Sequence, residues 1–175
     1  MLQLRPYTPT DATTILSWCT DEIGFYQWTA GVLGAYPLSE AQFNAVTALM
    51  PFTAVDERGI AGFFTLRKPR GTADELRFGF VIVAPALRGR GYGKAMLRLG
   101  LHYVFERYGA QRVSLGVFEN NPAAYRCYKA AGFSEVAASA SECYRVLGEE
   151  WRCVELAMEK AEYCQSRSGS RAWRT

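Results

Sequence analysis

Residues 81–94 read VIVAPALRGRGYGK, and this stretch decides the fold. Three β-branched residues run on to a proline, and then two arginines and three glycines crowd together ahead of Lys94. The run 76–84 carries apolar residues at both odd and even positions, which predicts a strand covered on both faces. A glycine-rich turn that follows such a strand and opens a helix presents unpaired backbone N–H groups, so it predicts a binding site for a phosphate.

Two well-known phosphate loops do not fit this turn. A P-loop needs a glycine where the chain has Arg88 and a hydroxyl residue where it has Ala95. A dinucleotide-binding turn needs G-x-G-x-x-G with an acidic residue about twenty positions later, whereas the chain has G-x-G-x-G and no such acid. The alternative to phosphate binding is a plain surface turn with solvated arginines.

The composition limits the class of protein. The chain of 175 residues is long enough for one domain with a real core, and 49% hydrophobic residues exclude general disorder. A net charge of +3 is too small to predict nucleic-acid binding. The five cysteines are widely spaced and include no CxxC pair, which favours reduced thiols over a disulfide framework or a zinc site. With no recognisable leader and no long apolar run, we expect a cytoplasmic protein that has no membrane segment, no metal and no nucleic-acid partner.

The order of elements predicts an α/β fold with a mixed sheet. Strands are expected at 2–7, 52–55, 60–66, 76–84 and 112–118, and 136–140 with 151–158 are expected to form a last hairpin. Helices are expected at about 12–19, 40–50, 92–108 and 122–129, whereas 25–36 is aromatic and interrupted by glycines and is expected to be irregular. One domain is expected over 1–164, followed by a flexible tail at 165–175.

Two segments resemble the GNAT superfamily of N-acetyltransferases. Arg88-Gly89-Arg90-Gly91-Tyr92-Gly93 matches the signature Q/R-x-x-G-x-G/A and lies between a strand and a helix. Asn121-Pro122-Ala123-Ala124-Tyr125-Arg126-Cys127-Tyr128, followed by Gly132-Phe133, is similar to the segment N-x-x-A-x-x-L-Y-x-x-x-G-F of that family. The resemblance is sharpest over 76–136. It implies a mixed, mostly antiparallel central sheet that is flanked by helices and splayed at the cofactor strand.

The resemblance also implies acetyl-CoA as the co-substrate. The backbone of Val81, Ile82 and Val83 would pair with the pantetheine arm, and the side chains of these residues need burial in any case. Asn121 would hydrogen-bond the same arm, or serve as the N-cap of the helix that Pro122 opens, or do both. The pyrophosphate would be wrapped by main-chain amides and nearby charges of Arg88, Gly89, Arg90, Gly91, Tyr92, Gly93 and Lys94.

Tyr128 matches the tyrosine that lies beside the cofactor sulfur in this family. As general acid, its phenol would give a proton to the departing thiolate. The alternative is an ordinary core tyrosine, and Tyr125 is a competing tyrosine on the same helix.

The general base has no clear counterpart in the sequence. Branches of the family carry a glutamate where this chain has Gly116 or Arg77. Glu75 lies two residues before Arg77 on the same face and is the candidate base, with a solvated strand-end carboxylate as the alternative. A water chain would also suffice to take the proton of the amine. His102 lies on the polar side of its helix, and a covalent relay with Cys127 is not expected.

The expected function is N-acetyl transfer from acetyl-CoA to a primary amine of a small molecule or peptide, by direct attack in a ternary complex. A catalytically idle acyl-CoA-binding sensor or interaction module is the alternative, because the glutamates of the family are missing; nucleotide binding by the same loop is a third. The segment 21–36 is expected to shape the acceptor site, and its acidic and aromatic residues would suit a cationic amine. An aromatic-rich core loop is the alternative there. A homodimer would be consistent with the family.

Overall fold

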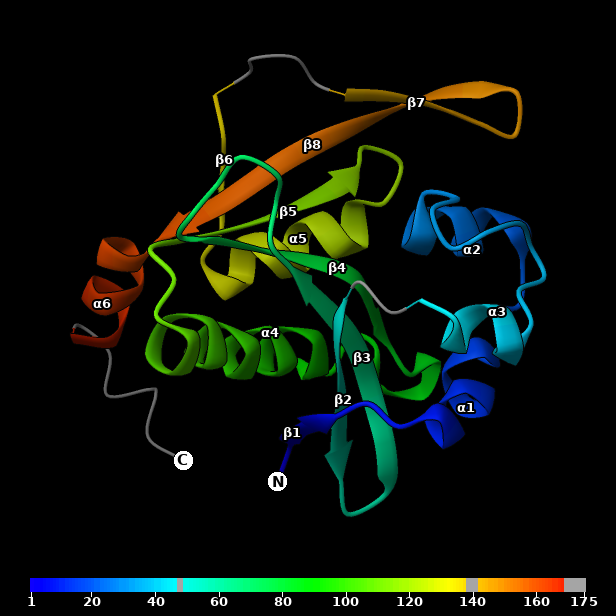
Figure 1. The fold of residues 1–175 in the computed structure, drawn as a ribbon, viewed down its shortest axis with the longest axis horizontal. Coiled ribbons are helices and arrows are strands. Elements are labelled where there is room, and N and C mark those ends of the chain that lie inside the picture. The colour runs from blue at the N-terminus through cyan, green and yellow to red at the C-terminus, as the bar shows by residue number, and fades with distance from the viewer. Residues whose placement is uncertain (47–48, 138–141, 169–175) are drawn as a thin grey trace.

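The computed structural model of the protein describes residues 1–46, 49–137 and 142–168. One mixed sheet has the order β1-β2-β3-β4-β5-β8-β6, and β7 also pairs with β8 (Figure 1). Among the described strand pairs, only β4 with β5 is parallel, so the expected mixed, mostly antiparallel sheet is confirmed. The strands are β1 (Gln3–Pro6), β2 (Met50–Asp56), β3 (Gly59–Arg67), β4 (Glu75–Val83), β5 (Arg112–Phe118), β6 (Ser134–Glu135), β7 (Glu142–Val146) and β8 (Glu149–Glu159).

The helices flank this sheet. They are α1 (Ala12–Leu16), α2 (Glu22–Thr29), α3 (Glu40–Asn44), α4 (Tyr92–His102), α5 (Pro122–Ala131) and α6 (Lys160–Ser168). A π-helical segment, Tyr103–Tyr108, continues α4, and Gly109 ends it in the left-handed conformation. The helix predicted over 92–108 is therefore continuous in the structure.

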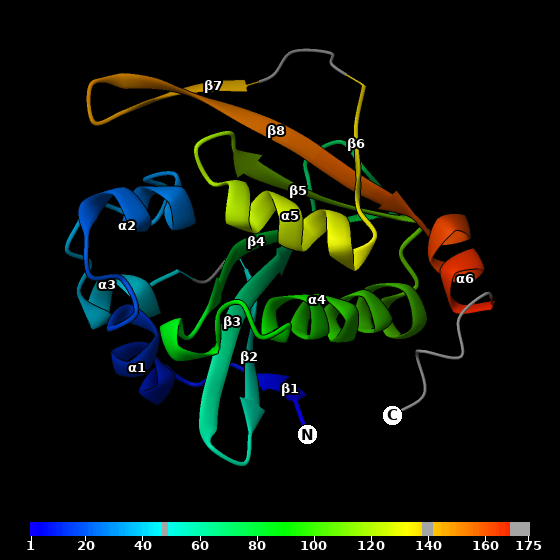
Figure 2. The ribbon, with the colours of Figure 1, turned by 180° about the vertical axis from the view of Figure 1, so that it is seen from behind.

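Two adjacent residues of β3 show how the two faces are covered. The side chain of Phe64 is buried in the core that includes residues of α4 and α5, whereas that of Phe63 is buried among α1, α2 and α3. In both ribbon views α4 and α5 lie side by side, and α1–α3 gather beyond the end of β4 (Figures 1 and 2). The sheet thus has a helix-covered core on each side, as the apolar run of β4 predicts.

β4 contains a bulge at Phe80. Thr65 of β3 pairs with Gly79, but Phe63 pairs with Ile82, so β4 holds one extra residue between these two pairs. Phe80 takes a left-handed φ of 48°, and its carbonyl accepts a hydrogen bond of 2.8 Å from Nε1 of Trp28.

β4 and β5 separate directly before this bulge. They pair from Glu75 with Arg112 to Arg77 with Ser114. Both strands are fully described, and they continue unpaired with each other to Val83 and Phe118. The splay expected at the cofactor strand is confirmed.

The structure corrects three sequence-based expectations in the irregular segments. Residues 25–29, expected to be irregular, belong to α2, which Asp21 caps by accepting a hydrogen bond of 2.7 Å from the amide of Gly24. The helix expected to reach Met50 ends at Asn44, and Met50 begins β2; residues 47–48 lie outside the described residues. The last hairpin joins 142–146 to 149–159, so its first strand is not 136–140, of which 138–140 lie outside the described residues.

The C-terminal end also differs from the expected tail. α6 continues to Ser168, so residues 165–168 are helical rather than part of a tail. Tyr163 anchors this helix because it is buried against Phe105, with ring centroids 4.8 Å apart. Residues 169–175 lie outside the described part of the chain.

Candidate active site

The loop between β4 and α4 uses its glycines for two different physical reasons. Gly89 and Gly91 have φ of 72° and 83°, a region that side chains strain to enter. Gly93 has no such φ, but a Cβ there would lie 2.8 Å from Sγ of Cys127. The first two glycines therefore shape the turn, and the third allows α4 to approach α5.

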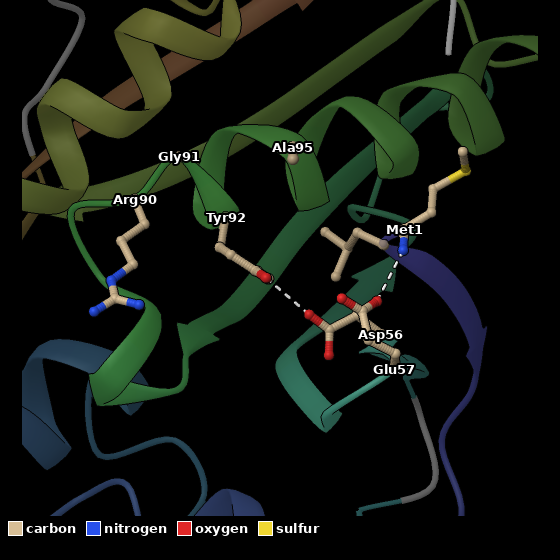
Figure 3. A pocket seen from close by; sticks show the side chains of 8 residues that line it. Met1, Asp56, Glu57, Arg90, Gly91, Tyr92 and Ala95 are labelled. Carbon is tan, nitrogen blue, oxygen red and sulfur yellow. Dashed lines mark hydrogen bonds and ion pairs between the residues drawn. The ribbon is translucent and has the colours of Figure 1, made fainter.

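The loop is braced on both sides. Nε of Arg88 donates a hydrogen bond of 3.0 Å to the carbonyl of Val83, which ties the loop to the end of β4. On the other side, the hydroxyl of Tyr92 donates a bond of 2.8 Å to Asp56, which lowers the pKa of Asp56. Tyr92, Asp56 and Arg90 line a small cavity of about 210 Å³, and the exposed side chain of Arg90 extends away from the Tyr92–Asp56 contact (Figure 3). The half-buried Lys94 lies one turn into α4.

The three predicted pantetheine-binding residues lie past the bulge, where β4 has left β5. The side chain of Ile82 is buried in the core under α1–α3, and those of Val81 and Val83 pack against the core on the α4 side. Their side chains are thus held on both faces of the sheet, while the edge of β4 toward β5 pairs there with no strand of the described residues. The free strand edge, the glycine loop and the start of α4 thus follow one another directly along the chain.

α5 carries the two predicted residues of the second motif. Asn121 caps the helix, since its Oδ1 accepts a hydrogen bond of 3.2 Å from the amide of Ala124, and Pro122 follows at the first helical position. Tyr128 is buried, with 7% of its surface exposed. Burial raises the pKa of Tyr128 well above its usual range, with smaller contributions from the nearby Cys127 and Cys153, so the phenol stays protonated at neutral pH. Tyr125 instead donates its hydroxyl hydrogen bond to Glu135.

A cleft of about 920 Å³ opens where β4 and β5 diverge. Its walls come from α2 and the residues after it, from β3, β4 and the end of β5, and from β6 to β8. Side chains that line it include Trp28, Thr65, Arg67, Phe80, Phe118, Tyr144 and Arg152. The expected acceptor segment 21–36 contributes Gln27–Ala30, Val32 and Leu33 to this wall.

Glu75, the base suggested by the sequence, lines the cleft, but it is held at the end where β4 and β5 are paired. Its Oε1 accepts a hydrogen bond of 2.5 Å from the hydroxyl of Ser114, and its Oε2 lies 3.5 Å from Nε of Arg112. It therefore sits where β4 and β5 are still paired.

Sequence reasoning missed Glu155, which lies beside the splay. The antiparallel register places Glu155 of β8 directly opposite Gly116 of β5. Arg77 reaches across β5 and makes a two-pronged ion pair with Glu155, one branch of which measures 2.8 Å from Nη2 to Oε2. Burial alone would lower the pKa of Arg77, but the bond to Glu155 raises it. The sequence shows on which face of its own strand Glu155 lies, but it does not show the register with β5 that brings Glu155 opposite Gly116, because that register joins two distant segments.

The remaining candidates play no part in this arrangement. His102 is exposed on α4. The described residues contain no group of three or more His, Cys, Asp or Glu side chains that could hold a metal ion. Among them, no helix is long and apolar enough to span a membrane.

Comparisons with known proteins agree with this architecture. A family described as "Acetyltransferase (GNAT) family" matches residues 15–133. The mycothiol acetyltransferase of Salinispora tropica is 37% identical over 62% of this chain and 35% of its own length, and that of Rhodococcus opacus is 33% identical over 54% and 32%. The chain thus spans about a third of the length of these curated relatives.

A solved structure resembles the whole fold. The spermidine N-acetyltransferase of Vibrio cholerae, in complex with CoA and spermine, superposes with a TM-score of 0.76 over 93% of this chain and 98% of its own, at 19% identity. At that identity the likeness concerns the fold. Together with the family match over more than half of the residues, the splayed sheet and the glycine loop lead to one conclusion: the chain belongs to the acetyltransferase (GNAT) family.

Proposed function

We propose that the protein transfers an acetyl group from acetyl-CoA to a primary amine of a small molecule or peptide, by direct attack in a ternary complex. The observation that carries this proposal is the separation of β4 from β5 beside the glycine loop, with a large cleft above it. This arrangement offers a free strand edge for an extended arm, amides for an anion and room for a second substrate.

The residues at the opening fit acetyl-CoA. A Cβ on Gly89 or Gly91 would meet no atom within 4 Å, so open space lies over the loop where a pyrophosphate would bind the amides at the start of α4. Within the described part of the chain, the backbone of Val81, Ile82 and Val83 has no partner strand toward β5; it would take the pantetheine arm, with Asn121 beside it. The neighbouring structure solved with CoA supports this choice of co-substrate. When bound, acetyl-CoA supplies the thioester whose acetyl group is transferred.

Tyr128 would serve as the general acid. Its buried, protonated phenol can give a proton to the thiolate that leaves when the C–S bond breaks. Glu75 stays the base candidate suggested by the sequence, although Ser114 and Arg112 already engage its oxygens.

The cleft would favour a cationic acceptor. Five carboxylates line it, from Glu75, Glu119, Glu135, Glu142 and Glu155, against three guanidinium groups, from Arg67, Arg77 and Arg152. Such an excess attracts a protonated amine. Similar proteins that are named spermidine N-acetyltransferase and mycothiol acetyltransferase support acetyl transfer to an amine. A cytoplasmic location fits the five free cysteines, and a homodimer stays a prediction from the family resemblance.

The test is acetylation of a defined amine pool, read by mass spectrometry. The pool contains spermidine, lysine, kanamycin and a short peptide with a free N-terminus, and acetyl-CoA carries a ¹³C-labelled acetyl group so that products are recognised by mass. A labelled product establishes the proposed activity. Binding of CoA by calorimetry without any labelled product would instead favour the acyl-CoA-binding module.

A further inference from the structure

The place where β4 and β5 begin to separate, called here the mouth of the splay, lies between Arg77 and Gly79 of β4 and between Ser114 and Gly116 of β5. The side chains of these positions would all point to one face of the sheet. Arg77 and Ser114 form the last β4–β5 pair, and Gly79 and Gly116 are the next residues on that face of each strand. A Cβ on Gly116 would lie 2.9 Å from Nη2 of Arg77 and 3.7 Å from Oε2 of Glu155. The absence of a side chain at Gly116 therefore lets the Arg77–Glu155 pair lie over β5 where it is no longer paired with β4.

Glu155 differs from the other carboxylates of the cleft in its position. Glu75 belongs to the paired part of the strands, Glu119 follows the end of β5 and contacts Arg152 at 3.6 Å, and Glu135 and Glu142 accept hydrogen bonds from tyrosine hydroxyls. Glu155 alone of the five stands in register with a residue at the mouth.

The pair leaves this carboxylate able to bind a second donor. A carboxylate has about four lone-pair sites, and the two bonds from Arg77 occupy two of them. The side chain of Glu155 is 41% exposed, whereas that of Arg77 is 20% exposed. Glu155 is therefore the more accessible partner of the pair, and it lines the cleft where a second donor could reach it.

We infer that Glu155 is the group that receives the amino group of the acceptor and takes its proton, and that Arg77 is the positioning residue that holds it over Gly116. This inference rests on the proposed function and deepens it. Glu155 takes the place of Glu75 as the candidate base, because the pairing of β8 with β5 positions its carboxylate where β4 and β5 begin to separate.

The protonated amine donates an N–H hydrogen bond to Glu155 and passes that proton to the carboxylate, and the freed lone pair forms the C–N bond at the thioester carbon. The C–S bond breaks, and the thiolate takes the phenol proton of Tyr128. The second proton that the nitrogen loses restores the phenol, and Glu155 returns its proton to solvent.

The experiment compares Glu155→Gln with wild type, with spermidine as the first probe and otherwise the amine of the pool that wild type acetylates fastest. Gln keeps the size of the side chain and an oxygen for Arg77, but it cannot take a proton. We expect kcat/KM for the amine to fall about 100-fold or more. The Kd for CoA, measured by calorimetry, stays within about twofold because Glu155 is not among the residues proposed to bind CoA.

Glu106→Gln is the matched control, since its carboxylate is about as exposed as that of Glu155 and is also paired with an arginine, Arg167, but lies outside the residues that line the cleft. Its kcat/KM is expected to stay within about threefold of wild type. If Glu155→Gln unfolds because Arg77 loses its partner, the double variant Arg77→Gln/Glu155→Gln removes the unpaired charge and carries the same test. Undiminished turnover by a folded Glu155 variant, or a loss confined to Glu75→Gln, overturns the inference alone. Wild-type protein that binds CoA but acetylates no amine overturns the proposed function and the inference together.

Discussion

At the scale of single residues, the phenol of Tyr128 leads to the sharpest kinetic prediction. Tyr128→Phe removes the proton donor and keeps the ring that packs near Phe133. We expect kcat to fall about 100-fold, because the thiolate then leaves without a proton, while the Kd for CoA stays unchanged. Steady-state kinetics with the acetylated amine, together with calorimetry, measure both quantities.

Tyr125→Phe is the control for this prediction. Tyr125 lies on the same helix, and its hydroxyl is engaged by Glu135. Its loss should leave kcat within about threefold. Equal losses in the two variants would show that removal of any hydroxyl from α5 disturbs the site, and Tyr128 would lose its assigned role.

Some residues of the proposed site could be predicted from sequence and others could not, for a physical reason. Asn121 and Tyr128 belong to one short helix with its own cap and its own spacing, so a local pattern identifies them. Glu155 enters the proposed site only because β8 pairs with β5 in one register. No local pattern contains that register, so the base was sought at the positions of Gly116 and Arg77, with Glu75 as the nearby candidate.

At the scale of elements, the contact between α4 and α5 depends on the missing side chain at Gly93. In Gly93→Ala the new Cβ would meet Sγ of Cys127 at 2.8 Å, so the helices must separate slightly. We expect a loss of about 1–3 kcal/mol in the free energy of unfolding, measured by urea denaturation. In the double variant with Cys127→Ala, the loss should be smaller than the sum of the two single losses, because the clash is gone.

Gly91→Ala provides the comparison for this coupling. Its cost of about 1–2 kcal/mol comes from the left-handed φ of 83°, and a Cβ there meets no atom within 4 Å. The loss in unfolding free energy of Gly91→Ala should therefore add to that of Cys127→Ala. Coupling of equal size in both pairs would contradict the assigned contact.

Elements with strong local signals were predicted, and those determined by tertiary packing were not. The strand, glycine turn and helix at 76–108 each have their own pattern, and the structure confirms them. α2 was missed because its segment is rich in aromatic residues and interrupted by glycines; the helix is instead held by packing, with Phe25 against Tyr36 and Trp28 against Phe43 of α3 and Phe63 of β3. The last hairpin was misplaced because its partner strand had to be chosen between two segments along the edge of β8.

At the scale of the whole molecule, Asp11 links the N-terminal segment to the sheet. Its carboxylate accepts two hydrogen bonds of 2.7 Å from Arg5 of β1 and one of 2.8 Å from Thr53 of β2. Burial alone would raise the pKa of Asp11, but the bonds from Arg5, Thr8 and Thr53 lower it from 3.8 to about 2. The ionised carboxylate therefore stabilises the fold.

The pH dependence of stability tests this link. A lowered pKa means that the contribution, about 2 kcal/mol, is fully present above about pH 4 and is lost as the pH falls toward about 2. In urea unfolding, the difference between wild type and Asp11→Asn should be constant from pH 7 to pH 5 and shrink toward pH 2. A difference that does not change over this range would contradict the link.

The extra residue at Phe80 has a consequence for how β4 tolerates change in length. Before the bulge, Leu76 and Phe78 turn to the α4 side; after it, Val81 and Val83 do, and Ile82 turns the other way. The bulge takes up one residue, because Phe80 follows Gly79 without the usual alternation and lies on the same side as Ile82. Deleting Phe80 would therefore restore plain alternation and leave Val81, Ile82 and Val83 on their present sides. Deleting a residue outside the bulge would instead exchange the two sides for the part of the strand beyond it. β4 thus tolerates the loss of a residue at its bulge but not elsewhere along its length.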